Sequence, residues 1–160
     1  MSWTEIMPGL ETVKHVDIER YMGTWFEIAK LPQSFEKGLV GITATYSILP
    51  SGKVRVMNKG YKGDFNGSTK TAQGRATVAD TKTNAKLKVS FFWPFTGNYW
   101  ILELGRDYEY AVVGDESRKN LWILSRTPQM DEAMYNDLLK RVQAKGFDVS
   151  KLEKTPQKPR

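Results

Sequence analysis

Short runs with the composition of β-strands recur along most of this chain, separated by Gly, Pro, Asn and Asp residues. Strands at such regular spacing, with turn residues between them, are typical of an antiparallel all-β sandwich or barrel. The eight strands that we expect cover residues Trp25–Leu31, Gly41–Leu49, Lys53–Tyr61, Thr69–Asp80, Ala85–Phe92, Tyr99–Leu104, Tyr108–Gly114 and Asn120–Ser125.

Alternation within these runs indicates strands with one apolar face and one polar, solvent-exposed face. In residues 85–91, Leu87, Val89 and Phe91 fall on one side, while two lysines and a serine fall on the other. Residues 71–78 alternate small apolar side chains with polar ones in the same way. If eight such strands close into a barrel, the small inner side chains leave room for one small ligand.

The two ends of this strand series carry residues that can lock the barrel at one end. Gly23 and Trp25 lie at the start of the first run, and Arg126 directly follows the last one. In a sheet that closes on itself these ends become neighbours, so we expect the Arg126 guanidinium to lie over the Trp25 indole. A desolvated cation–π contact of this kind contributes about 2 kcal/mol. We interpret Gly23, Trp25 and Arg126 as structural residues of a closed end.

After Arg126 the hydrophobic period changes from that of a strand to that of a helix. Residues 131–145 form an amphipathic pattern with acidic residues in the first turn and basic residues in the last. Met134, Leu138 and Val142 make up its apolar face. We therefore expect a C-terminal α-helix that packs on the outside of the barrel.

The length of 160 residues suits one domain, which we expect to span residues 1–160. Residues 1–12 look like an irregular leader with a Pro-Gly turn signal. Residues 154–160 contain two prolines and few apolar side chains, so we expect a disordered tail there.

Composition excludes some kinds of chemistry. Because cysteine is absent, the chain has no disulfides and no thiolate nucleophiles or metal ligands. The net charge of +6 favours anionic partners such as membrane surfaces and acidic ligands, although a charge of about 2–8 also serves solubility alone. No block of five like charges occurs, so we expect no nucleic-acid partner.

The residue types needed for catalysis are also scarce. His15 is the single histidine and lies before the first strand, so a Ser-His-Asp arrangement cannot form within the barrel. No His, Asp or Glu cluster has metal-ligand spacing. Two carboxylates such as Glu27 and Glu103 could act as an acid–base pair, but nothing in the sequence requires it. We predict no catalytic residue, no metal and no cofactor.

Three segments, taken in order, resemble the three motifs of the lipocalin family. Gly23–Ala29 looks like the first motif, Asp107–Gly114 the second and Leu121–Pro128 the third. The resemblance runs from about residue 13 to residue 157. It is closest to the branch that holds bacterial lipocalins, plant temperature-induced lipocalins and apolipoprotein D.

This resemblance implies an eight-stranded antiparallel up-and-down barrel, closed at the Trp25–Arg126 end and open at the other. It implies non-enzymatic binding, storage or transport of a small hydrophobic ligand such as a fatty acid or lysophospholipid, in membrane maintenance or stress protection. A tetrapyrrole or sterol-like ligand and a lipocalin-fold enzyme remain alternatives. The oligomeric expectation is a monomer or weak dimer.

The same resemblance bears on the cellular compartment of the protein. Many bacterial members are anchored by an N-terminal cysteine, which this chain lacks, whereas the plant members have no signal peptide and associate peripherally with membranes. The N-terminus shows no basic start followed by an apolar stretch. We expect a cytoplasmic or peripherally membrane-associated protein, or a periplasmic or outer-membrane one if the chain is a processed form.

The candidate ligand contacts combine the resemblance with strand parity. Tyr46, Asn58 and Trp122 match residues that line the pocket of apolipoprotein D. The others are inward by alternation or lie at an aromatic rim, and ordinary barrel core is the competing interpretation for the apolar ones. The full predicted set is Glu27, Tyr46, Val56, Asn58, Leu87, Val89, Phe91, Trp93, Tyr110, Trp122 and Leu124.

Overall fold

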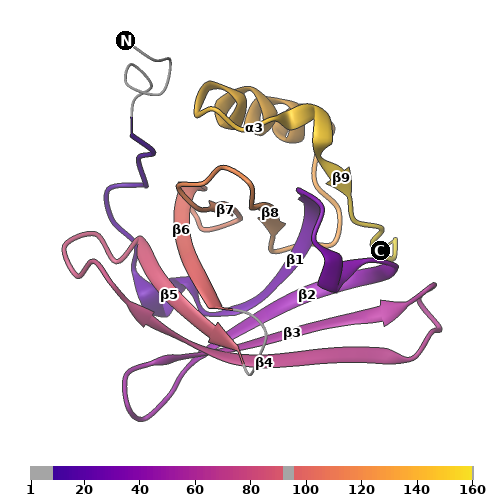
Figure 1. The fold of residues 1–160 in the computed structure, drawn as a ribbon, viewed down its shortest axis with the longest axis horizontal. Helices are drawn as coiled ribbons and strands as arrows, with labels where there is room; N and C mark the ends of the chain where they lie inside the picture. Colours follow the sequence, from indigo (N-terminus) through magenta and orange to yellow (C-terminus); the bar gives the residue numbers. More distant parts are fainter. Residues whose placement is uncertain (1–8, 92–95, 160) are drawn as a thin grey trace.

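Within residues 9–91 and 96–159, which the computed structural model describes, eight antiparallel strands pair in chain order and close into a barrel (Figure 1). The first strand completes the ring because it pairs with both the second and the eighth. The barrel strands are β1 (Gly23–Lys30), β2 (Leu39–Ile48), β3 (Val54–Lys62), β4 (Thr69–Val78), β5 (Lys86–Phe91), β6 (Thr96–Leu104), β7 (Tyr110–Gly114) and β8 (Leu121–Ser125).

The expected eight-stranded barrel is therefore confirmed, and the strand ends differ from the prediction by a few residues. The largest shift is at β6, which begins at Thr96 rather than at Tyr99. At β7 the prediction began too early, because Tyr108 has a φ of +58° and belongs to a turn. Of the predicted leader, residues 1–8 lie outside the described part, and residues 9–12 form no helix or strand.

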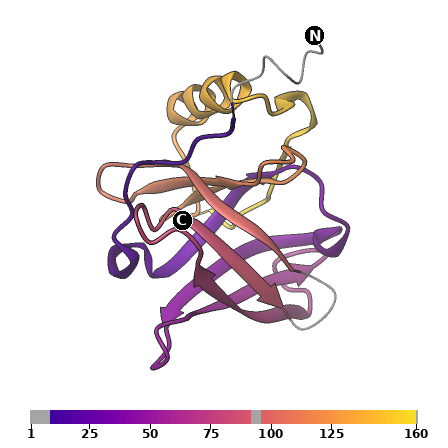
Figure 2. The same ribbon diagram turned by 60° about the vertical axis from the view of Figure 1, so that its left-hand side comes forward.

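Alternation along each strand separates two apolar layers. The inner layer fills the barrel and includes Trp25 and Val113. The outer layer lies between the barrel wall and the helix α3 (Glu132–Ala144), whose Leu138 and Val142 are fully buried. Figure 2 shows α3 lying across one side of the barrel, as the amphipathic pattern predicted.

The closed end is built around Arg126. Its guanidinium carbon lies 3.8 Å from the centre of the Trp25 ring, so the expected stacking is present. The indole is fully buried and donates to the Tyr21 carbonyl in the short helix α2 (Ile18–Tyr21). Gly23 has a φ of +102°, and a Cβ there would come within 3.2 Å of Arg126 Nη1. Glycine at this position lets the chain turn from α2 into β1 beneath the guanidinium.

The tail from residue 154 was expected to be disordered, and that prediction is wrong for its first four residues. After the 3₁₀ turn η2 (Val149–Lys151), strand β9 (Glu153–Lys154) pairs with the end of β1, as Figure 1 shows. The Gln157 side chain then donates to the carbonyls of Glu27 (2.8 Å) and Ile42 (2.9 Å). Hydrogen-bond pairing between β1 and β2 stops at Phe26. Farther along, the tail supplies hydrogen-bond partners for the backbone groups of these two strands.

Candidate functional site

A cavity of about 560 Å³ lies inside the barrel. Because β1 runs away from the closed end, the 3₁₀ turn η1 (Ser34–Glu36) that follows it lies at the opposite end, and all three of its residues line the cavity. A volume of this order suits a small molecule rather than a macromolecule. The predicted residues that line it are Glu27, Tyr46, Val56, Asn58, Val89, Phe91, Trp122 and Leu124.

Two predicted contacts among the described residues, Leu87 and Tyr110, do not belong to this lining. Leu87 packs in the core nearer the closed end, opposite Val78, where the barrel is filled by side chains. Tyr110 lies on the outer face of β7 and its hydroxyl accepts from Arg141 Nη1, because Ala111 and not Tyr110 has the inward parity. Trp93 lies outside the described residues.

A β-bulge in β1 changes which of its side chains point toward the inside of the barrel. Between Glu27 and Ala29 the register with β8 shifts by one residue. As a result Ala29 packs in the outer layer, and Lys30 is buried with its Nζ 3.7 Å from Glu27 Oε2. A regular strand would have placed Ala29 inward, so strand parity could not have identified Lys30.

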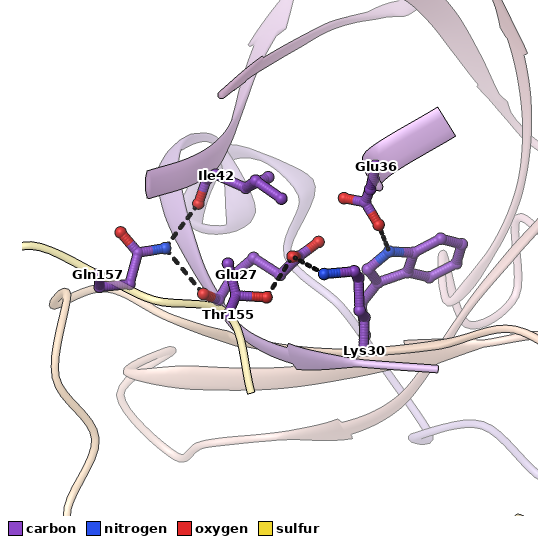
Figure 3. A network of polar contacts seen from close by, with 7 residues as sticks. Glu27, Lys30, Glu36, Ile42, Thr155 and Gln157 are labelled. Carbon is purple, nitrogen blue, oxygen red and sulfur yellow. Dashed lines mark hydrogen bonds and ion pairs between the residues drawn. The ribbon is translucent and has the colours of Figure 1, made fainter. Parts of the chain in front are cut away.

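The bulge organises a buried polar cluster on one wall of the cavity (Figure 3). Glu27 is 3% exposed and its carboxylate accepts from Thr155 Oγ1 at 2.5 Å. Glu36 reaches in from η1, where its Oε2 accepts from Trp122 Nε1 at 3.3 Å. Burial, together with the hydrogen-bonded Glu36 carboxyl group, raises the pKa of Glu27 well above its usual range. The Glu27 carboxyl group therefore holds its proton more tightly than an exposed one would.

Sequence reasoning did not find Lys30, Glu36, Thr155 or Gln157. Glu36 lies in a loop and Thr155 and Gln157 in a proline-containing tail, where no periodicity indicates which side chains turn inward. The one sequence feature at Glu36 is a single carboxylate in a short loop between two strands. This feature is too common to indicate a buried side chain.

The open end of the cavity carries basic side chains on one side. Lys70 of β4 lines it, and Lys59 of the adjacent strand β3 lies at its rim, with Nζ 5.4 Å from the centre of the Tyr61 ring. Lys70 Nζ donates to the Phe35 carbonyl at 3.0 Å and so ties η1 to the opposite wall. Phe35 is 37% exposed beside this contact. The opening is thus lined by cations and an aromatic side chain, which suits an amphiphile.

Other kinds of site are not indicated in the part of the chain that the structure describes. No group of three or more His, Asp or Glu residues there could hold a metal ion. Among the same residues, none of the helices is both long and apolar enough to span a bilayer.

Comparison with known proteins agrees with the geometry. A model of the lipocalin-like domain family matches residues 16–157. The chain is 44% identical to temperature-induced lipocalin-1 of Arabidopsis thaliana over 92% of its own length and 83% of the relative's. It is 44% identical to the outer membrane lipoprotein Blc of Escherichia coli K12, covering 89% and 80% of the two chains. Apolipoprotein D of Bos taurus is 35% identical, covering 90% and 78%.

The fold matches solved structures as well. The structure of insecticyanin from the tobacco hornworm Manduca sexta superimposes with a TM-score of 0.75 at 22% identity, covering 94% of this chain and 86% of that one. At this identity the likeness concerns the fold alone.

Proposed function

The chain belongs to the lipocalin family, whose members bind small hydrophobic molecules, and we propose that its cavity takes up the acyl chain of a fatty acid or lysophospholipid. The observation that carries this proposal is the cavity itself: about 560 Å³ inside the barrel, lined by apolar side chains such as Val56, Val89 and Leu124. An acyl chain can pack against this apolar part of the lining.

Burial of apolar surface supplies the driving force. At about 25 cal/mol per Å², removing roughly 300 Å² of acyl surface from water is worth about 7 kcal/mol before the costs of association. The names of relatives such as apolipoprotein D and the outer membrane lipoprotein support a lipid as ligand.

The cations at the opening support an anionic head group. Lys70 can pair with a carboxylate or phosphate while the acyl chain lies inside. Lys70→Gln should weaken binding of palmitate by about threefold to tenfold and leave the uncharged palmityl alcohol unchanged. Lys88→Gln, on the exposed outer face of β5, is the matched control and should affect neither ligand.

Uptake itself can be tested directly. Native mass spectrometry of protein purified from its own source would show a lipid adduct, and titration of the delipidated protein with palmitate should quench or shift the Trp122 fluorescence. If neither method detects uptake of fatty acids or lysophospholipids of any chain length, the proposal is wrong.

We further propose that the protein acts by binding rather than by catalysis, that it contacts membranes peripherally when it exchanges ligand, and that it works as a monomer or weak dimer. The family relationship supports the first statement. The basic side chains at the opening support the second, because they would face an anionic lipid surface. Flotation with anionic and neutral vesicles distinguishes an electrostatic membrane contact from none.

A further inference from the structure

Three tyrosine hydroxyls form a chain at the inner end of the cavity. Tyr21 comes from α2, Tyr46 from β2 and Tyr99 from β6, and their rings pack against one another. Tyr21 Oη and Tyr99 Oη are 2.7 Å apart, and Tyr99 Oη donates to Tyr46 Oη at 2.8 Å. Tyr46 and Tyr99 line the cavity, whereas Tyr21 lies behind them.

Counting protons along this chain fixes the direction of every hydrogen bond. A phenol has one proton to donate. Tyr99 uses its proton on Tyr46, so the contact between Tyr21 and Tyr99 must be donated by Tyr21. Tyr46 is then an acceptor within the chain, and its own proton is left over.

Among residues 9–91 and 96–159, the Tyr46 hydroxyl makes no hydrogen bond besides the one it accepts from Tyr99. Burial raises the pKa of Tyr46 and the charge of the nearby Glu27 adds to this effect, so the hydroxyl stays protonated at neutral pH. The hydrogen bonds of Glu27 itself go to Thr155 and Glu36. Because Tyr46 lines the cavity, its hydroxyl proton can point into the cavity.

We propose that Tyr46 is a specificity-determining hydrogen-bond donor at the inner end of the cavity, and that the preferred ligand carries an oxygen acceptor there. A keto, hydroxyl or ester oxygen on the buried part of the ligand fits this donor, whereas a plain alkyl chain leaves it unpaired. Buried donors in folded proteins are almost always paired, so the ligand supplies the partner that the protein lacks. This inference rests on the proposed function, because it assigns the ligand class of the same cavity as oxygenated lipids.

The experiment compares palmitate with a series of keto derivatives of palmitate, positional isomers of one another in which the keto group moves stepwise along the acyl chain. Binding is measured by calorimetric titration of wild type and Tyr46→Phe. For the isomer whose carbonyl reaches the inner end, Tyr46→Phe should weaken binding by about tenfold, which corresponds to about 1.4 kcal/mol. Palmitate should bind the variant equally well or slightly better, because the variant no longer buries an unpaired donor. Isomers with the keto group nearer the opening should behave like palmitate.

Tyr21→Phe is the matched control. It removes a hydroxyl from the same chain but leaves the Tyr46 proton in place, so the preference for one keto position should survive. Equal effects of Tyr46→Phe on palmitate and on every keto isomer would overturn the inference while leaving lipid uptake intact. Failure of wild type to bind any of these ligands would overturn the proposed function and the inference with it.

A spectroscopic measurement on wild type does not depend on the folding of a variant. The infrared stretch of an isotope-labelled keto group should move to lower frequency in the complex than in a hydrocarbon solvent, because the carbonyl accepts a hydrogen bond. A bound carbonyl with the hydrocarbon frequency at every keto position would rule out a donor at the inner end.

Discussion

Replacing Arg126 by alanine should destabilise the barrel strongly while leaving ligand affinity almost unchanged. The guanidinium lies 3.8 Å from the centre of the Trp25 ring. It also donates to three backbone carbonyls, those of Arg20 (2.8 Å), Thr24 (3.3 Å) and Tyr108 (3.2 Å). These carbonyls belong to three separate segments of the closed end, so one side chain joins all of them.

The magnitude follows from these contacts. The cation–π contact contributes about 1 kcal/mol for a guanidinium that is partly exposed. Each of the three hydrogen bonds contributes about 1 kcal/mol, but two are long, so the total loss should be about 3 kcal/mol. For a chain of this size that loss lowers Tm by about 6–12 °C.

Urea unfolding followed by far-UV circular dichroism gives the free energy, and calorimetric titration with palmitate gives the affinity. Arg75→Ala, at an exposed position of β4, is the control and should change stability by less than about 0.5 kcal/mol. Arg126→Lys should fall between, because it keeps a cation over the ring but loses the fork that reaches several carbonyls. A loss below about 1 kcal/mol for Arg126→Ala, or a larger loss of affinity than of stability, would refute the assignment of Arg126 to structure.

Three further predictions concern the cavity wall. The raised pKa of Glu27 means that the folded state holds its proton more tightly than the unfolded state, so stability should fall as the pH rises from about 4.3 through that raised pKa. Glu27→Gln should remove this fall, which urea unfolding at a series of pH values would detect; an unchanged pH profile would contradict the assignment. Gln157→Ala should cost about 2 kcal/mol by thermal unfolding, because two hydrogen bonds between the tail and the barrel are lost. Trp122→Ala should weaken palmitate binding by about tenfold in calorimetric titration, and an unchanged affinity would place the acyl chain elsewhere.

Most of the fold could be predicted because it depends on local patterns. Alternation of period two assigned Val89 and Phe91 to the inner face, and the helical period assigned Leu138 and Val142 to the outer layer. Both patterns act over a few residues and need no knowledge of the rest of the chain. The motif around Trp25 added the family relationship.

The polar part of the cavity could not be predicted in the same way. The β-bulge after Glu27 reverses the parity of the next residues and buries Lys30. Glu36 and Thr155 reach Glu27 from a loop and from the tail, which are 9 and 128 residues away along the chain. Contacts of this range arise only when the barrel has closed, so no local pattern records them.

The amino-acid sequence by itself determined the strands, the helix and the apolar inner face, because each is written in residue types at fixed spacing. The pairing of Trp25 with Arg126 could be predicted because the two residues lie at the two ends of the strand series, which closure of the sheet brings together. Only the tertiary structure decided which polar groups face the cavity and which of them are left without a partner. The physical reason is that hydrogen-bond pairing depends on distances of about 3 Å between side chains from separate segments. The proton of Tyr46 is the clearest case, since its availability depends on hydroxyl groups contributed by α2 and β6.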